Sequence, residues 1–207
     1  NEQELTSLSQ SSQSYALSNG FVFRKTPELN FQGETGANVG ILSHTLYAQP
    51  FSRNLFQHLQ RHTLVMNSLL DKMSRDSDFL ASSLEDCGSK GDVEFTGKLL
   101  DLFRRAKSKQ KLHLGIYRND FMMHSNDGHS IMPQQVEINT IVTGATVMSA
   151  LLHKLHMFLY RKSETIRQHL QQFGKNGAPE PVTSLKGITN ALQLAHHTFM
   201  QQELVTA

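Results

Sequence analysis

The chain has 207 residues, enough for one substantial hydrophobic core or two small ones. Its 20 basic and 18 acidic residues leave a net charge of +2, which gives no electrostatic reason to expect nucleic acid as a partner. The single cysteine excludes an intrachain disulfide framework and favours a reducing compartment. No apolar run approaches the roughly 18 residues of a membrane span.

The first part of the chain, residues 1–48, is expected to form an N-terminal helix and loop region. Within it, the Ser/Gln-rich stretch 7–14 predicts a frayed segment, because such a composition buries little apolar surface. Residues 30–38 carry two glycines among polar side chains and predict a loop. We expect residues 49–207 to form a second part of helices and antiparallel strands, whose sheet is completed by sequence outside this chain.

Apolar side chains recur every three or four residues after Pro50, which predicts helical structure over residues 51–84. Asp78 is expected to cap a short helix at the end of this stretch. Residues 88–91 predict a glycine-containing loop, and Asp92 is expected to cap the helix that follows.

The same periodicity predicts a long helix over residues 146–173, which Gly174 ends. A Gly/Pro-rich loop over residues 175–181 follows, and Ser184 is expected to cap a last helix. Few strands remain beside these helices. The expected class is therefore α+β, helix-rich with a small antiparallel sheet.

His153 and His156 stand three positions apart on the expected helix, a spacing at which two imidazoles are able to share a metal ion. A zinc or iron site needs a third or fourth ligand with supporting contacts. No Cys pair, His-Glu-x-x-His run or carboxylate stands at a matching spacing. We therefore interpret both histidines as surface or half-buried helix residues.

The run 135–141, Gln-Val-Glu-Ile-Asn-Thr-Ile, is the most informative stretch of the sequence. Its apolar Val136 and Ile138 alternate with polar residues, which predicts a half-buried strand. The alternation puts the Glu137 carboxylate and the Asn139 amide on one face, roughly 6.5–7 Å apart along the strand. Oxygen ligands of these two kinds suit a hard cation such as Mg²⁺, although a solvated edge strand gives the same pattern.

A second alternating run, residues 112–117, predicts another strand, which ends at Arg118. A guanidinium group at a strand end commonly grips a substrate carboxylate through two parallel hydrogen bonds. Residues 126–128, Asn-Asp-Gly, supply turn chemistry before the strand that carries Glu137.

This order of segments resembles the eukaryotic glutathione synthetase family of ATP-grasp ligases. In that family a strand ends in an Arg-Ser-Asp-Tyr-Met-like segment and a Gln-Ile-Glu-Ile-Asn-Thr-Ile segment follows, similar to residues 118–122 and 135–141 here. Residues 15–20 also look like the family's N-terminal helix end, and the helical stretch 51–84 falls in matching order. The resemblance covers nearly the whole chain and well under half of a full family member. It implies the N-terminal portion of an ATP-grasp-type fold.

The resemblance implies a peptide-bond-forming ligase that joins γ-glutamylcysteine to glycine through an acyl phosphate made from ATP. Glu137 would then ligate Mg²⁺ and touch the ATP phosphates, Asn139 would be a second Mg²⁺ ligand, and Met122 would lie near the nucleotide. Arg118 would contact the γ-glutamylcysteine. In such a site the metal ion draws charge off the transferring phosphoryl group, while the arginine places and neutralises a carboxylate.

One segment departs from the family pattern. The family shows Ser-Ala-Ser at the positions that hold γ-glutamylcysteine, whereas this chain follows Ile141 with Val142, Thr143 and Gly144. The resemblance assigns these four positions to substrate binding. A buried substrate group without its hydrogen-bond partner costs about 1–3 kcal/mol, so two lost serines lower affinity by roughly 10²–10³-fold or more. The change favours an altered substrate over random drift.

In the family, the ATP-grasp lysines, the glycine-rich lid and the third metal ligand lie beyond the segment that this chain matches. We therefore expect no ligation from this segment alone. Two other hypotheses stay open: a non-catalytic family derivative that acts as a binding or interaction module, and a structural helical domain without a site. By resemblance we expect a homodimer. The single cysteine, the charge balance and the lack of a long apolar run favour a cytoplasmic location with neither nucleic acid nor membrane as a partner. Secretion of a divergent paralogue stays open because the native N-terminus is not visible.

Overall fold

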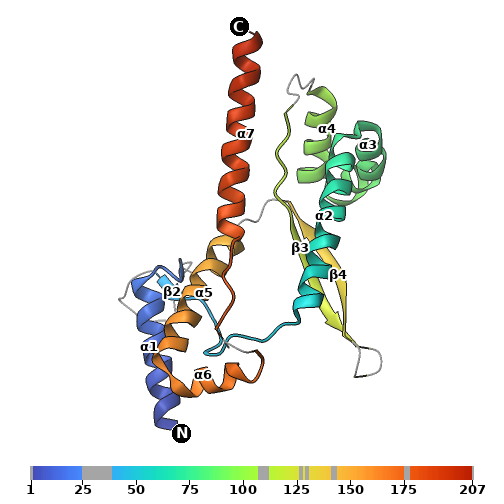
Figure 1. Cartoon of the computed structure of the whole chain (residues 1–207). Helices are drawn as coiled ribbons and strands as arrows, with labels where there is room; N and C mark the ends of the chain where they lie inside the picture. The colour runs from blue at the N-terminus through green and yellow to red at the C-terminus, as the bar shows by residue number, and fades with distance from the viewer. Residues whose placement is uncertain are drawn as a thin grey trace, which may run out of the picture. The chain divides into compact units, whose positions relative to one another are not determined.

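The computed structural model describes residues 2–24, 39–106, 112–125, 128, 131–140, 144–174 and 178–206, apart from the side chains of residues 88, 89 and 202–206. The described residues form a helix-rich α+β chain with two antiparallel two-stranded hairpins, which confirms the expected fold class (Figure 1). The chain divides into two compact units. The first holds Asn1–Phe51 and Thr143–Gln193, and the second holds Ser52–Val142 and Leu194–Ala207. The division expected after residue 48 stays a prediction.

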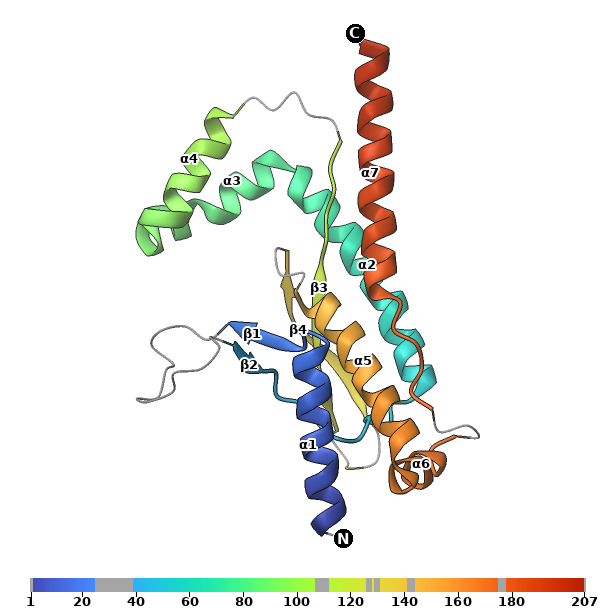
Figure 2. The same ribbon diagram turned by 90° about the vertical axis from the view of Figure 1, so that its left-hand side faces the viewer.

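The first unit is an assembly of helices with a small hairpin at one side (Figure 2). Its elements are α1 (Glu2–Ser18), β1 (Val22–Arg24), β2 (Val39–Ile41), α5 (Gly144–Lys162), α6 (Glu164–Gln171) and the first part of α7 (Ser184–Thr206). Its hydrophobic core gathers buried side chains from α1, α5, α6 and the start of the hairpin: Leu8, Ala16, Phe21, Leu155, Leu159, Ile166 and Leu170. Beside this core the rings of Tyr15 and Phe158 stack with their centroids 4.6 Å apart.

Helix α1 runs without a break through the Ser/Gln-rich stretch, so the expectation of a frayed segment is wrong. Leu8, Ser12 and Ala16 recur at four-residue intervals, occupy one face of the helix and are buried there. Burial of this face outweighs the polar composition of the rest. After the helix Gly20 has φ of 75°, and the N–H of Phe21 donates to the carbonyl of Ala16, as in a Schellman C-cap.

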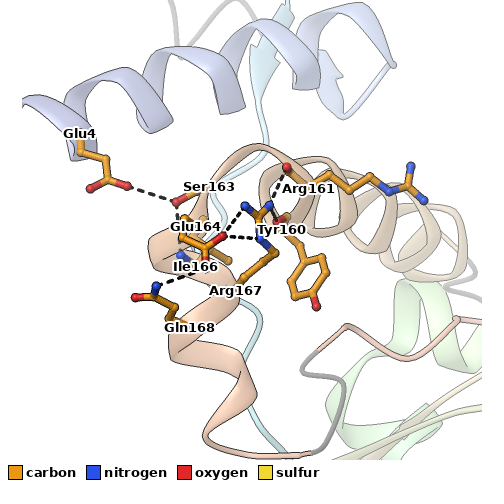
Figure 3. A network of polar contacts seen from close by, with 8 residues as sticks. All are labelled: Glu4, Tyr160, Arg161, Ser163, Glu164, Ile166, Arg167 and Gln168. Atoms are coloured by element: carbon orange, nitrogen blue, oxygen red, sulfur yellow. Dashed lines mark hydrogen bonds and ion pairs between the residues drawn. The ribbon is translucent and has the colours of Figure 1, made fainter.

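The single helix expected over residues 146–173 is broken at Ser163, which corrects that prediction. Ser163 has an extended backbone, and its hydroxyl oxygen accepts a hydrogen bond of 3.2 Å from the N–H of Ile166, which caps α6. The same hydroxyl donates to Glu4 of α1 at 3.2 Å (Figure 3). Arg167 reaches back to two carbonyls at the end of α5. The chain therefore turns while both helix ends keep hydrogen-bond partners.

The side chain of His156 on α5 is half-buried and reaches the segment that follows β2. Its Nε2 donates to the carbonyl of Thr45 over 2.9 Å. Within the described residues, no three His, Cys, Asp or Glu side chains gather closely enough to hold a metal ion. Ser184, expected as a helix cap, is instead the first residue of α7, so the capping position falls to Thr183.

The second unit carries the other hairpin and a series of helices (Figure 1). Its elements are α2 (Arg53–Arg75), α3 (Ser77–Asp86), the π-helical turns η2 (Cys87–Gly91) and η3 (Val93–Gly97), α4 (Lys98–Arg105), β3 (Arg118–His124), β4 (Met132–Asn139) and the end of α7. Of the helices that the structure describes, none combines the length and the apolar character that a membrane crossing requires.

Two aspartates set the helix starts in this unit. The carboxylate of Asp76 accepts a hydrogen bond of 2.9 Å from the N–H of Phe79 and caps α3, so the assignment of this cap to Asp78 is wrong. Asp92 accepts from two N–H groups of η3 at 3.2 and 3.3 Å, which confirms its predicted capping role. The loop expected over residues 88–91 belongs instead to η2, where the N–H of residue 92 bonds the carbonyl five positions back.

Strands β3 and β4 pair antiparallel, starting with Arg118 opposite Asn139. The strand expected over residues 112–117 is wrong, because regular pairing begins only at Arg118. Among the described residues, β4 ends at Asn139, opposite Arg118, and the register of the pair does not extend to residues 112–117. Arg118 therefore opens a strand rather than leaving one.

A β-bulge interrupts the hairpin. Asp120 lies opposite Glu137 while the next residue, Phe121, lies opposite Gln135, which leaves Val136 as the extra residue. Val136 is exposed for this reason, whereas strict alternation predicted it on the inner face.

Helix α2 covers one face of this hairpin through polar and aromatic contacts. The amide of Gln135 donates to Asn119 at 2.9 Å, and the amide of Asn119 donates to Asn67 of α2 at 3.0 Å. The ring of Phe121 meets the ring of His62 edge to face, with centroids 5.5 Å apart. These contacts fix which face of the hairpin is turned to the helix.

Candidate functional site

Four polar side chains lie on the opposite face of the β3–β4 hairpin, and we call them the polar face: Arg118, Asp120, Glu137 and Asn139. The register places Arg118 opposite Asn139 and Asp120 opposite Glu137. Because side chains alternate along each strand, all four point to the same side. The residues that alternate with them on β3 contact α2 instead. Arg118, Glu137 and Asn139 thus share one face of the hairpin, while their roles as cation and substrate contacts stay predictions.

Arg118 and Asp120 form a two-pronged ion pair. Arg118 Nε lies 2.9 Å from Asp120 Oδ1 and 3.2 Å from Oδ2, and Arg118 Nη2 lies 2.8 Å from Oδ2. Both side chains are about one-third exposed, at 34% and 35%. The same Nη2 atom is 3.6 Å from Oε1 of Glu137, so the guanidinium group lies between two carboxylates.

The amide of Asn139 joins the two carboxylates. Its Nδ2 donates to Glu137 Oε1 at 2.8 Å and to Asp120 Oδ2 at 3.2 Å. Since both contacts use Nδ2, the carbonyl oxygen Oδ1 is the oxygen ligand that Asn139 has to offer. The side chain of Glu137 is 57% exposed, so solvent and solutes reach its carboxylate.

Arg118 and Asp120 each stabilise the charged form of the other. The pKa of Asp120 is lowered, mainly because Arg118 donates hydrogen bonds to its carboxylate. The pKa of Arg118 is raised, mainly by the same hydrogen bonds. Two carboxylates and one guanidinium leave the polar face with a net charge of −1 at neutral pH.

The other predicted site residues are distributed over both units. Met122 alternates in register with Asp120 on β3, so it lies on the side of the polar face, and its side chain is 65% exposed. Gly144 is the first residue of α5 in the first unit. The predicted substrate positions Ile141, Val142 and Thr143 lie outside the described residues.

The sequence matches the family model for the eukaryotic glutathione synthase, ATP binding domain, over residues 2–204. The chain belongs to this family. The glutathione synthetase of Dictyostelium discoideum is 28% identical over 98% of this chain, and the glutathione synthetase large chain of Schizosaccharomyces pombe is 29% identical over 79% of it. The family expected from the sequence motifs is thereby confirmed.

A solved structure shares the fold of this chain. The glutathione synthetase like-effector GSS30 from Globodera pallida, in its apoform, matches with a TM-score of 0.62 and 25% identity over 78% of this chain and 34% of that chain. The curated relatives are longer: this chain spans 42% of the Dictyostelium protein and 34% of the Schizosaccharomyces chain. What is established is membership of the ATP-binding domain family.

The polar face of this glutathione synthase family member fits a divalent cation in charge and in ligand type. Glu137 offers an exposed carboxylate and Asn139 an amide oxygen, both hard ligands that Mg²⁺ accepts. Two carboxylates already converge on one electropositive group, the Nδ2 amide of Asn139. Few protein ligands are needed, because Mg²⁺ commonly completes its shell with water and phosphate oxygens.

Sequence reasoning assigned no role to Asp120, although it bonds both Arg118 and Asn139. A clue was present, since residues two apart on a strand share a face and opposite charges there attract. This clue applies only if Arg118 and Asp120 lie on the same strand. The strand was expected to end at residue 117, whereas it begins at Arg118, so the Arg118–Asp120 pair was not predicted.

Proposed function

We propose that this chain is the part of a glutathione-synthetase-type ligase that supplies cation, ATP and substrate contacts from its polar face. The reaction joins γ-glutamylcysteine, or an altered analogue, to glycine with ATP as co-substrate and Mg²⁺ as cofactor. The observation that carries the proposal is the convergence of Arg118, Glu137 and Asn139 on one hairpin face in a chain of the glutathione synthase family. The relatives named glutathione synthetase support the substrate class.

Each residue has a chemical task in this proposal. Glu137 and Asn139 would hold Mg²⁺, Glu137 would contact the ATP phosphates, and Met122 would lie near the nucleotide. The ion supplies charge neutralisation for phosphoryl transfer. Arg118 uses Nε and Nη2 to bind Asp120, so the Nη1 edge of its guanidinium is the side that binds the carboxylate of γ-glutamylcysteine. Held in this way, the guanidinium is oriented before the substrate arrives.

The segment 141–144 determines which dipeptide is accepted in our proposal. The absence of the family's two serines at Val142 and Gly144 favours a substrate other than unmodified γ-glutamylcysteine. The same observation favours a second candidate function, a family derivative that binds nucleotide without ligase activity. The neighbouring fold named a glutathione synthetase like-effector is in keeping with such a derivative.

ATP-dependent phosphate release by the full-length protein tests the proposal against this second candidate. With Mg·ATP, glycine and a panel of γ-glutamyl dipeptides, we expect release that depends on one dipeptide, and weak release with γ-glutamylcysteine. The double variant V142S/G144S should lower the KM for γ-glutamylcysteine. Nucleotide binding without release for any dipeptide establishes the second candidate instead.

A cation-ligand variant checks the metal half of the proposal. E137Q keeps the shape of the side chain and removes its charge, and turnover should fall at least ~100-fold because a catalytic cation contributes several kcal/mol. The matched control is E94Q on η3, an exposed carboxylate paired with Lys98, which should leave turnover unchanged. Equal turnover in E137Q and wild type would remove Glu137 from the site.

The assembly and location proposed here are a cytoplasmic homodimer. Light scattering distinguishes a defined dimer from a monomer or from polydisperse aggregates, and only the first supports a native interface. Cell fractionation tests the location, which is of interest because relatives from Solanum lycopersicum and Arabidopsis thaliana are named chloroplastic.

A further inference from the structure

One guanidinium nitrogen of the polar face lies between two carboxylates at unequal distances. Arg118 Nη2 is 2.8 Å from Asp120 Oδ2 and 3.6 Å from Glu137 Oε1. The first distance is that of a charge-assisted hydrogen bond, and the second is too long for one. Arg118 Nε adds contacts of 2.9 and 3.2 Å to Asp120. Arg118 is therefore bound to Asp120 and merely close to Glu137.

We propose that Asp120 is a positioning residue that holds Arg118 away from Glu137 and thereby keeps the Glu137 carboxylate available to a divalent cation. The inference rests on the proposed function, because it takes Glu137 as a cation ligand. It adds a role for a residue that otherwise has none. Asp120 acts through Arg118 and does not touch the cation.

The charge of the polar face depends on Asp120. With Asp120 present, the two carboxylates outweigh the single guanidinium and the net charge is −1. Without it, one guanidinium faces one carboxylate, and the net charge is zero. Arg118 then has Glu137 as its nearest acid and needs only a small side-chain rotation to bond it. A cation would have to displace that guanidinium before it reached Glu137.

The hydrogen bonds of Asp120 argue against a direct role as a ligand. Its Oδ2 accepts from Arg118 Nε, from Arg118 Nη2 and from Asn139 Nδ2, and its Oδ1 accepts from Arg118 Nε. An ionised carboxylate has about four lone-pair sites, so these three N–H groups engage most of the acceptor capacity of Asp120. The carboxylate of Glu137 is more exposed, at 57% against 35%, and is the one turned to solvent.

Binding of Mn²⁺ to the full-length protein, followed by electron paramagnetic resonance with ADP present, tests the inference without requiring turnover. The variants are D120N, R118Q and the double variant R118Q/D120N. D120N should weaken Mn²⁺ binding about 10-fold or more, in the range of losses seen when supporting partners of a metal ligand are removed. R118Q should bind Mn²⁺ within roughly 3-fold of the wild type, and the double variant should bind within roughly 3-fold of R118Q, because the competitor for Glu137 is gone in both.

A second ion pair in the same unit provides the matched control. Asp101 and Arg105 pair at 2.7 Å on α4, and the variants D101N and D101N/R105Q should bind Mn²⁺ as the wild type does. Recovery of Mn²⁺ binding when R118Q is added to D120N is an outcome that a folding defect would not produce.

Each result bears on one claim. Wild-type affinity in D120N overturns the inference while leaving the cation site intact. Equally weak binding in D120N and R118Q/D120N also overturns it, because Asp120 would then be a ligand or a structural support. Failure of the wild type itself to bind Mn²⁺ defeats the proposed metal site, and the inference with it.

Discussion

The two units differ in where their apolar side chains lie. In the first unit α1, α5 and α6 bury a continuous set of side chains, and Leu155 and Leu159 are fully inaccessible. In the second unit Leu100 is the buried apolar side chain among the described residues, and α2 and α3 bury none. Leu64 of α2 is 70% exposed.

The second unit is organised instead by side-chain hydrogen bonds on both faces of its hairpin. One face bonds α2 through Asn119, and the other is the polar face. The comparison separates two properties. Apolar packing in the first unit stabilises the fold, whereas the chemistry proposed for the chain stands on a polar hairpin with little core beneath it. A change that damages one property should spare the other.

The largest expected effect is on the core of the first unit. Leu155→Ala leaves a cavity at a fully buried position and should lower the free energy of unfolding by roughly 2–5 kcal/mol. L64A on α2 is the control and should change stability by less than about 0.5 kcal/mol. Urea unfolding followed by circular dichroism measures both. Equal losses in the two variants would erase the contrast between the units.

Loss of a helix cap should lower stability less than the core substitution does, and again more in the first unit than in the second. Ser163→Ala removes the buried cap of α6 and the contact with Glu4, and it should cost about 1–2 kcal/mol. Ser52 caps α2 at the surface with a longer hydrogen bond of 3.4 Å. S52A should cost about 0.5 kcal/mol, at the low end for caps. The reverse order would mean that the break at Ser163 is not held by its side chain.

The smallest expected effect is a pH dependence of stability from His156. Burial lowers the pKa of His156 below its ordinary value of 6.5, because the charged imidazolium is desolvated in the fold. As the pH falls below about 6.5, the unfolded chain takes up a proton that the folded chain resists. Stability should therefore decline from pH 7 towards pH 5.

The variant H156Q removes this titration and should flatten the decline, as measured by urea unfolding at a series of pH values. H58Q, at an exposed position of α2, is the matched control and should keep the wild-type slope. A steeper decline in H156Q than in wild type would show that His156 favours folding at low pH, opposite to the direction expected from its lowered pKa.

Periodicity was enough to predict the helices after Pro50 and the strand that carries Glu137, because both rest on which face is apolar. It failed where one residue redirects the chain. Ser163 breaks a helix that its apolar pattern would continue, and the bulge at Val136 shifts an alternation that looks regular in sequence. Such features depend on tertiary partners, here Glu4 and the register with β3.

The site was predictable to a similar degree. Glu137 and Asn139 share a strand, so their common face follows from alternation alone. Their meeting with Arg118 was anticipated by family resemblance, but the pairing of Arg118 with Asp120 requires the strand to begin at residue 118. Long-range pairing decides where a strand begins, and composition does not reveal it.

We propose that the polar face of the β3–β4 hairpin is the cation site. Nuclear magnetic resonance of the ¹⁵N-labelled protein tests it most directly, with Mn²⁺ added in the presence of ADP. The amide signals of Glu137 and Asn139 should broaden first, and E137Q should abolish this broadening. Strongest broadening at another position, such as the histidines of α5, or unchanged broadening in E137Q, would show that the cation binds elsewhere.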